Sequence, residues 1–494
     1  MCAVETLLIE AKAVKVSLLD DAARVESLAV LSEFRADFYD CLTARADALF
    51  ELADALLCAD GPVKSLVDLT LTPEHRRGHG ALYDGLNCGR IEANRLRAEL
   101  AGLPVPRTDD GRIVLAVDVS PWLRSDASTS AERLFCHVYG RAKSVSQFIP
   151  GWPYSFLVAL ESGRTSWTGI LDAVRLGPQD DATAVTADQL RAVVERLVAA
   201  GHWTDGDADI LIVMDAGYDV TRLAFVLADL PVEMLGRIRS DRVLRLSKPP
   251  RAPGTNGRPP KHGPEFSLAR PATWPEPQHT TMTDTTRYGT ATASSWDRLH
   301  PRLTHRTCWL DHDDELLVIE DTLIRLEVDH LPGDRDPDPV WLWSSATDAT
   351  GADVDRWWRA YLRRFDLEHT FRLFKQTLGW TRPKIRTPQA ADRWTWIVIA
   401  VHTQLRLARS LAEDLRRPWE KPAPPGRLTP ARVRRGFRNI RPATPPARWC
   451  TQTRQARGPG RPPGSKNRRP APRHDVGKTA KRDLTLTDDQ DRKG

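Results

Sequence analysis

The chain has 494 residues, of which 41% are hydrophobic and 28% charged, so it is long enough for two to four domains with substantial cores. No apolar run reaches 18 residues and the N-terminus has no signal-peptide pattern, which argues against a membrane or secreted protein. The seven cysteines form no C-x-x-C pair and no Cys/His cluster with zinc spacing. We therefore expect a soluble protein with reduced thiols that stays inside the cell.

The net charge of +6 is unevenly distributed along the chain. From residue 416 to the end there are 22 Lys or Arg and 6 Asp or Glu, a net of +16, which leaves −10 for the rest. This Pro- and Arg-rich segment cannot bury enough apolar surface to fold alone, so we expect a disordered basic tail at 416–494. Such tails usually bind an anionic polymer, here nucleic acid; the alternative is a solvated tail that only aids solubility.

The first hundred residues are predicted to be helical. The segments "DALFELADALL" and "IEANRLRAELAGL" repeat apolar residues at helical spacing, and the second stops at a glycine. A turn-rich linker follows at residues 102–112. We therefore assign residues 1–105 to a helical N-terminal domain.

Short β-branched or aromatic runs bounded by turn residues next predict consecutive antiparallel strands. They lie at residues 112–120, 133–140 and 154–162. An amphipathic helix at 186–201 precedes a nearly continuous apolar strand at 208–219, which we expect to be buried on both faces. A further helix, "VTRLAFVLADL", and a further strand, "VEMLGRIR", complete a mixed α/β order.

This order is interrupted by an insertion at about 240–345 that is predicted to be rich in β-structure and loops. Residues 249–277 hold nine prolines, and strands are predicted at 315–328 and 340–348. The α/β domain with its insertion covers residues 106–415.

Helices dominate the prediction after the insertion. One spans roughly residues 353–378 with Asp353 as its N-cap, and a long core helix covers 390–415. Within the tail, Thr429 and Pro430 predict the cap and first turn of one short basic helix.

Two aspartates lie on the most apolar strands of the α/β domain. Asp118 follows "LAV" and Asp215 follows "LIVM", and buried aspartates are rare unless they are paired or bind a metal. A lone aspartate at a strand end is often a turn former or helix cap, which is the alternative for each. Carboxylates on neighbouring strands repel, and a divalent cation between them removes that cost.

A third carboxylate lies in "YLRRFDLEHTFRLFK", residues 361–375. At 100° per residue, Tyr361, Arg364, Glu368 and Lys375 share an arc of about 60°. We expect Glu368 to complete a site for Mg²⁺, or Mn²⁺ in its place, with Asp118 and Asp215, since oxygen ligands suit these ions. Arg364 and Lys375 could then hold phosphates. The alternative is a partly buried ion pair between Arg364 and Glu368.

The spacing Y-x2-R-x3-E-x6-K resembles the YREK signature of bacterial insertion-sequence transposases of the DDE type, and "SAERLFCHVYGRAKS" resembles the branch called DDE superfamily endonuclease. Asp118 and Asp215 look like the first two acidic residues of that family's catalytic triad, and Glu368 like the third. The resemblance covers about residues 30–415. It implies a ribonuclease H-like mixed sheet with a β-rich insertion, preceded by a helical domain and followed by the basic tail.

The resemblance also implies an activity and partners. Such enzymes cut double-stranded DNA at the terminal inverted repeats of their element with divalent metal ions. The freed 3′-hydroxyl then attacks target DNA. We expect a homodimer on DNA at the bacterial nucleoid. The N-terminal helices are candidates to recognise the element ends, although helix packing alone would explain them.

Further residues are candidates for DNA contact through resemblance. Tyr361 belongs to the signature, and Trp341 and Trp343 could stack a displaced base; the alternative for either tryptophan is a place in the core. "GRPPKHG" and "PGRPPGSKNRR" resemble AT-hooks, in which Arg258 and Arg461 would enter the minor groove. The first could equally be a proline-rich loop, and the second is favoured by its basic neighbours.

Other interpretations of the sequence stay open. Many relatives carry an arginine after the second aspartate, whereas this chain reads "AGYD", so Asp219 is a weaker rival of Asp215. At the level of function, the alternatives are a catalytically inactive or domesticated DNA-binding protein, and a nuclease without strand transfer.

Overall fold

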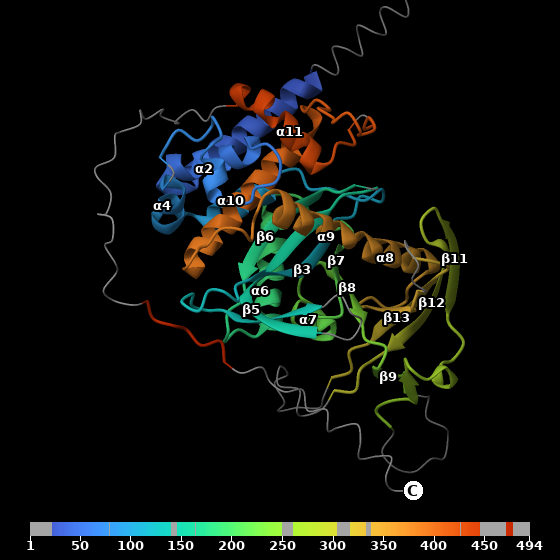
Figure 1. Ribbon diagram of the computed structural model, residues 1–494. Helices are drawn as coiled ribbons and strands as arrows, with labels where there is room; N and C mark the ends of the chain where they lie inside the picture. Colours follow the sequence, from blue (N-terminus) through green and yellow to red (C-terminus); the bar gives the residue numbers. More distant parts are fainter. Residues whose placement is uncertain are drawn as a thin grey trace, which may run out of the picture.

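A computed structural model gives the architecture, and a ten-stranded mixed sheet is its centre (Figure 1). The structure describes residues 22–78, 80–139, 146–163, 165–248, 260–303, 317–331, 337–424, 426–444 and 471–477. The strands run in the order β11-β12-β13-β14-β8-β7-β3-β5-β4, with β6 also paired to β5. The predicted α/β class is confirmed.

The middle of the sheet consists of three parallel strands with a core on each face. They are β3 (Val114–Leu123), β7 (Ile210–Met214) and β8 (Val232–Ile238). Every residue of β7 is buried, as the continuous apolar run predicted. Alternate residues of β3 enter opposite cores, because successive side chains of a strand point to opposite faces.

Helices cover both faces of these strands. On one face lie α6 (Ala182–Ala199) and α7 (Val220–Val226). On the other lie α8 (Gly351–Arg363), α9 (Phe365–Arg372) and α10 (Pro388–Leu407), drawn in orange above the sheet in Figure 1.

Beyond β3 the sheet is antiparallel. The long strand β5 (Ser146–Leu160) pairs with β3 along one side. Along its other side it pairs with β4 (Leu134–Tyr139) over its first half and with β6 (Thr168–Arg175) over its second. The sequence predicted β3, β4 and β5 but missed β6, in which an aspartate interrupts the apolar run.

The predicted insertion extends this same sheet. Strands β11 (His279–Thr285), β12 (Gly289–Leu299), β13 (Asp321–Val328) and β14 (Val340–Ser344) join it where β14 pairs with β8. A small side sheet pairs β9 (Val243–Arg245) with β10 (Glu265–Ser267). The sequence predicted β13 and β14, whereas β11 and β12 are rich in threonine and serine and lack an apolar pattern.

One buried acid in this extension gives a test by pH. Asp321 is 0% exposed, and neither carboxylate oxygen accepts a well-formed hydrogen bond from the described residues. The nearby indole N–H of Trp343 acts to lower its pKa, but burial has the larger effect. Burial raises the pKa of Asp321 well above its usual value. The unfolded chain releases this proton above about pH 4 while the folded chain retains it, so the free energy of unfolding falls as the pH rises.

We expect Asp321→Asn to be more stable than the wild type at neutral pH, by roughly 1–3 kcal/mol, and nearly equal to it below about pH 4. Urea unfolding of both proteins over this pH range measures the difference. Parallel pH dependence of the two curves would contradict the assignment of a protonated buried acid.

A helical layer packs beside the sheet and draws on both ends of the chain. Its N-terminal part is a helix over 22–40 followed by α2 (Ala46–Cys58), α3 (Leu66–Leu69), α4 (Ala81–Cys88) and α5 (Ala93–Gly102), with the short pair β1 (Leu42–Ala44) and β2 (Arg90–Ile91). Its C-terminal part is α10 with α11 (Pro430–Ile440), and Figure 1 shows both beside α2. No helix in the described ranges is both long and apolar enough to cross a bilayer.

A buried ion network holds this helical layer together. Arg35 pairs with Asp54 of α2 at 2.9 Å, and Asp54 also accepts a 2.6 Å contact from Arg441 just after α11. The short basic helix predicted from Thr429 and Pro430 is confirmed as α11, and it belongs to the folded body.

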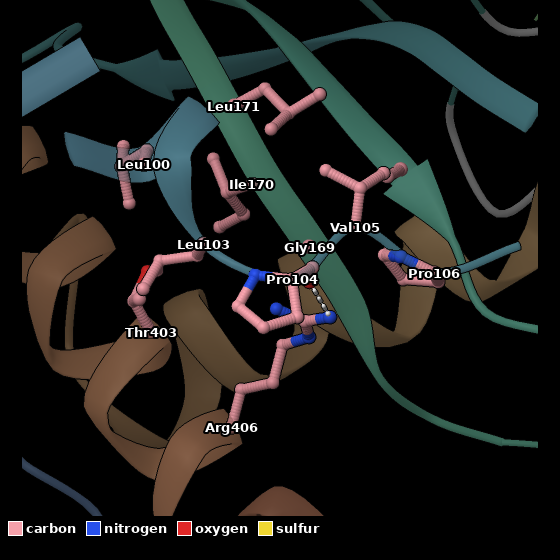
Figure 2. Close-up of a pocket in the computed structure, with 11 residues that line it drawn as sticks. Leu100, Leu103, Pro104, Val105, Pro106, Gly169, Ile170, Leu171, Thr403 and Arg406 are labelled. Carbon is pink, nitrogen blue, oxygen red and sulfur yellow. Dashed lines mark hydrogen bonds between the residues drawn. The ribbon is translucent and has the colours of Figure 1, made fainter. Parts of the chain in front are cut away.

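The linker between the helices and the sheet is also fixed. Figure 2 shows Pro104 and its neighbours beside Ile170 of β6 and Arg406 of α10, around a small apolar cavity. Arg406 donates to the Pro104 carbonyl at 3.0 Å. This contact ties the start of the linker to α10.

Candidate active site

Asp118 and Asp215 lie side by side because their strands are parallel neighbours. Ala116 of β3 is opposite Val213 of β7, so the same register two residues later places Asp118 beside Asp215 on one face of the sheet. Asp118 lies within β3, and Asp215 directly follows β7. The two aspartates that the sequence singled out therefore converge.

Arg364 bridges the two carboxylates. Its Nη1 donates to Oδ2 of Asp118 at 3.1 Å, and its Nη2 donates to Oδ2 of Asp215 at 3.3 Å. The other oxygen of each aspartate accepts the next backbone N–H, from Val119 and Ala216, at 2.8 Å. Arg364 is 4% exposed, so a buried guanidinium cation neutralises the adjacent carboxylates.

The single helix predicted over 353–378 is divided into α8 and α9 at Arg364, whose backbone dihedral angles remain helical. It begins with a capping box in which Thr350 is the N-cap and Asp353 the third residue, so the predicted cap was wrong by three positions. Helix α8 ends at Arg363, α9 starts at Phe365, and residues Leu373–Thr377 form a π-helical turn. Such turns are frequent at functional sites.

The four signature residues of this region differ in exposure. Tyr361 is buried and its hydroxyl donates to Oδ1 of Asp215 at 3.4 Å. Glu368 is exposed and Lys375 half-buried. Arg364 pairs with the two aspartates in place of the Arg364–Glu368 ion pair that was the sequence-based alternative.

The electrostatics connect Glu368 to the aspartates. Burial raises the pKa of Asp118 to about 6; Arg364 opposes this shift, while the charges of Glu368 and Asp215 add to it. Burial also lowers the pKa of Lys375, against the attraction of Glu368 and Asp118. Glu368 and Lys375 thus lie within electrostatic reach of Asp118.

The donor set fits a divalent cation in its chemistry. Asp118 and Asp215 present carboxylate oxygens that already share one cationic group, and such oxygens suit Mg²⁺ or Mn²⁺. In the ranges described above, no three His, Cys, Asp or Glu side chains are close enough together to hold a metal ion. Glu368 would therefore have to approach the aspartate pair.

Two further residues are clarified by the geometry. Asp219, the rival of Asp215, is the N-cap of α7 and accepts from the Arg222 backbone N–H at 3.2 Å, so it has a structural role. Arg237 of β8, which sequence reasoning missed, has its Nη1 3.9 Å from Oδ1 of Asp215. The sequence feature that could have indicated Arg237 is a charged residue in the strand that follows the one before Asp215.

The structure buries both tryptophans predicted to stack a base. Trp341 is 4% exposed and packs with Phe266, Trp274 and Trp296, and Trp343 is 1% exposed in the core beside α6 and α7. Their location matches the alternative of core tryptophans. For Trp341 or Trp343 to stack on a DNA base, its ring would have to leave the core. Base stacking by these residues stays a prediction.

Both AT-hook-like segments have their candidate arginine, Arg258 or Arg461, outside the part of the chain that the structure describes.

The comparisons with known proteins agree with this geometry. The model of a family described as DDE superfamily endonuclease matches residues 37–302, more than half of the chain. The matched region contains Asp118 and Asp215 and ends before Glu368. No curated protein matches the chain.

Proposed function

This chain belongs to the DDE superfamily endonuclease family, and from this premise we propose that it is the DNA transposase of a bacterial insertion sequence. In this proposal it cuts the ends of its element and joins the freed 3′-hydroxyl to target DNA, acting as a homodimer on DNA. The observation that carries the proposal is the convergence of Asp118, Asp215 and the helix of Glu368 on one face of the sheet.

We assign the three carboxylates to metal binding. Asp118, Asp215 and Glu368 would hold Mg²⁺, with Mn²⁺ able to replace it, and these ions would activate a water or 3′-hydroxyl and stabilise the leaving oxygen. The paired strands position two ligands, and the third, Glu368, is exposed on α9 and would have to approach them.

The surrounding cations suit a DNA backbone. Arg237 is 46% exposed beside Asp215, and Lys375 is half-buried beside Asp118 and Glu368. Arg364 has the forked geometry that binds phosphate in a bidentate manner. We propose that these three side chains, with Tyr361, hold the phosphates that flank the scissile bond.

Purified protein is expected to cut duplex DNA that carries the sequences flanking its reading frame when Mg²⁺ or Mn²⁺ is present, and not in EDTA. Strand transfer is measured in the same reaction as products in which a labelled end is joined to a second, unlabelled plasmid. Cleavage that persists in EDTA would overturn the metal-dependent mechanism.

Two other functions have an observation in their favour. The family is described as an endonuclease family, with no mention of strand transfer, which favours an endonuclease that nicks DNA without joining it. The Arg364 bridge across the aspartates favours a DNA-binding protein without activity. Nicked products without joined products identify the first, and DNA binding without cleavage in either metal identifies the second.

A further inference from the structure

The guanidinium of Arg364 takes the oxygens that a metal ion would need. Each aspartate already uses Oδ1 to accept a backbone N–H, from Val119 or Ala216. The remaining oxygens, Oδ2 of Asp118 and Oδ2 of Asp215, both accept from Arg364. A cation bound at these two Oδ2 atoms and the guanidinium of Arg364 in its present position therefore compete, because both are positively charged and both use the same oxygens.

The guanidinium of Arg364 contacts two aromatic rings, but one of its nitrogens makes no hydrogen bond with the described residues. Its guanidinium lies 5.7 Å from the ring centroid of Tyr361 and 5.2 Å from that of Phe365. Its Nε is buried and has no hydrogen-bond partner among the residues described. Arg364 is also the single residue between α8 and α9, where the backbone keeps helical dihedral angles, with φ −51° and ψ −29°.

We propose that Arg364 is an internal counter-ion that competes with divalent metal for Asp118 and Asp215, and that a DNA phosphate relieves this competition by drawing the guanidinium away. The inference rests on the function proposed above and adds its regulation. Before DNA arrives, Arg364 neutralises the carboxylate pair and keeps metal affinity low. Once DNA is bound, the fork of Arg364 exchanges two carboxylates for phosphate oxygens, which it binds equally well.

The arrangement couples metal binding to DNA binding. If DNA tightens metal binding by removing Arg364, metal must tighten DNA binding by the same factor, because coupling free energies are reciprocal. Couplings of this kind are typically about 5–150-fold. The consequence is an enzyme that binds its metal tightly only after DNA is bound.

The competition is tested without cleavage, by calorimetric titration of the DNA-free protein with Mn²⁺. We expect Arg364→Gln to bind Mn²⁺ at least about 10-fold more tightly than the wild type. Arg364→Lys keeps the charge but loses the two parallel N–H donors of the guanidinium. Its Mn²⁺ affinity is expected to lie between those of the wild type and Arg364→Gln, and it provides a second variant should the first fold poorly. Arg359→Gln is the matched control: it removes an exposed arginine of α8 that pairs with Asp355, and should leave Mn²⁺ affinity unchanged.

Coupling is tested by repeating the titration with a short random-sequence duplex, after subtraction of Mn²⁺ binding to the duplex alone. The duplex should tighten Mn²⁺ binding to the wild type and to Arg359→Gln, and should have little effect on Arg364→Gln. Equal or weaker Mn²⁺ binding by both Arg364 variants, relative to the wild type, would overturn the inference.

The two proposals fail differently. If Mn²⁺ binds tightly to the protein–duplex complex but no DNA is cut, the transposase function is rejected. The proposed competition between Arg364 and the metal ion is unaffected. Metal-dependent cleavage together with equal Mn²⁺ affinities of wild type and Arg364→Gln rejects the competition alone.

Discussion

Asp118→Asn is expected to lower the rate of DNA cleavage by roughly 10³-fold or more, with DNA binding retained. The substitution preserves the size of the side chain and its ability to accept the Val119 N–H, but removes the negative charge. An amide oxygen is a poorer ligand for a divalent ion than a carboxylate, and Asp118 is the most buried of the three candidate ligands. Binding should persist because phosphate contacts are spread over many side chains.

The measurement is a single-turnover cleavage assay beside fluorescence anisotropy of labelled DNA. Asp219→Asn is the matched control, because Asp219 caps α7 close to the site and asparagine is an equally good cap. Cleavage by Asp219→Asn should remain within a few-fold of wild type. Unchanged cleavage by Asp118→Asn, or a loss confined to Asp219→Asn, would remove Asp118 from the mechanism.

The strands that carry the aspartates could be predicted because local pattern and tertiary environment agree there. Residues 210–214 are apolar without interruption, which is the pattern of a strand covered on both faces, and that burial was found. The amphipathic helix predicted at 186–201 was found as α6 for the same reason. In each case the residues that make the pattern are those that fill the core.

Strands without an apolar pattern were missed. Strand β11 has the sequence HTTMTDT and alternates half-buried and exposed residues, with Thr281 donating to Asp355 of α8. Its position depends on its hairpin partner β12, which also lacks an apolar pattern, and on α8, whose Asp355 is 74 positions away along the chain. The same holds for β6, whose buried Asp172 is paired with Arg97 and Arg196.

The candidate site was predicted in its residues and not in its contacts. Equal 100° steps placed Tyr361, Arg364, Glu368 and Lys375 along one seam, but Lys375 lies in a π-helical turn, where the step per residue is smaller. The pairing of Arg364 with Asp118, 246 positions away, could be read only from the structure.

Ending the chain at residue 415, where the sequence placed the start of a disordered tail, is expected to unfold the protein or leave it barely stable. Helix α11 buries Val433, Phe437 and Ile440, whose exposure would cost roughly 5–9 kcal/mol. Arg434 of α11 also donates to the carbonyls of Leu56 and Gly61, at 2.8 and 2.7 Å, which would lose these partners. The loss is comparable to the whole stability of a typical domain.

A chain ending at residue 444 is the matched control, since it retains α11 and its contacts with α2 while removing most of the Pro- and Arg-rich tail. Circular dichroism and urea unfolding of the two truncated chains measure the difference. The longer chain should unfold cooperatively near the wild-type midpoint, and the shorter should show little or no folded baseline. Equal midpoints would mean that α11 is dispensable, and that the helical layer is complete without the C-terminal end of the chain. The expected result would instead mean that α11 is needed for the helical layer to fold. The structure agrees with this role, because the arginines of α11 pair with carboxylates and carbonyls of the folded body.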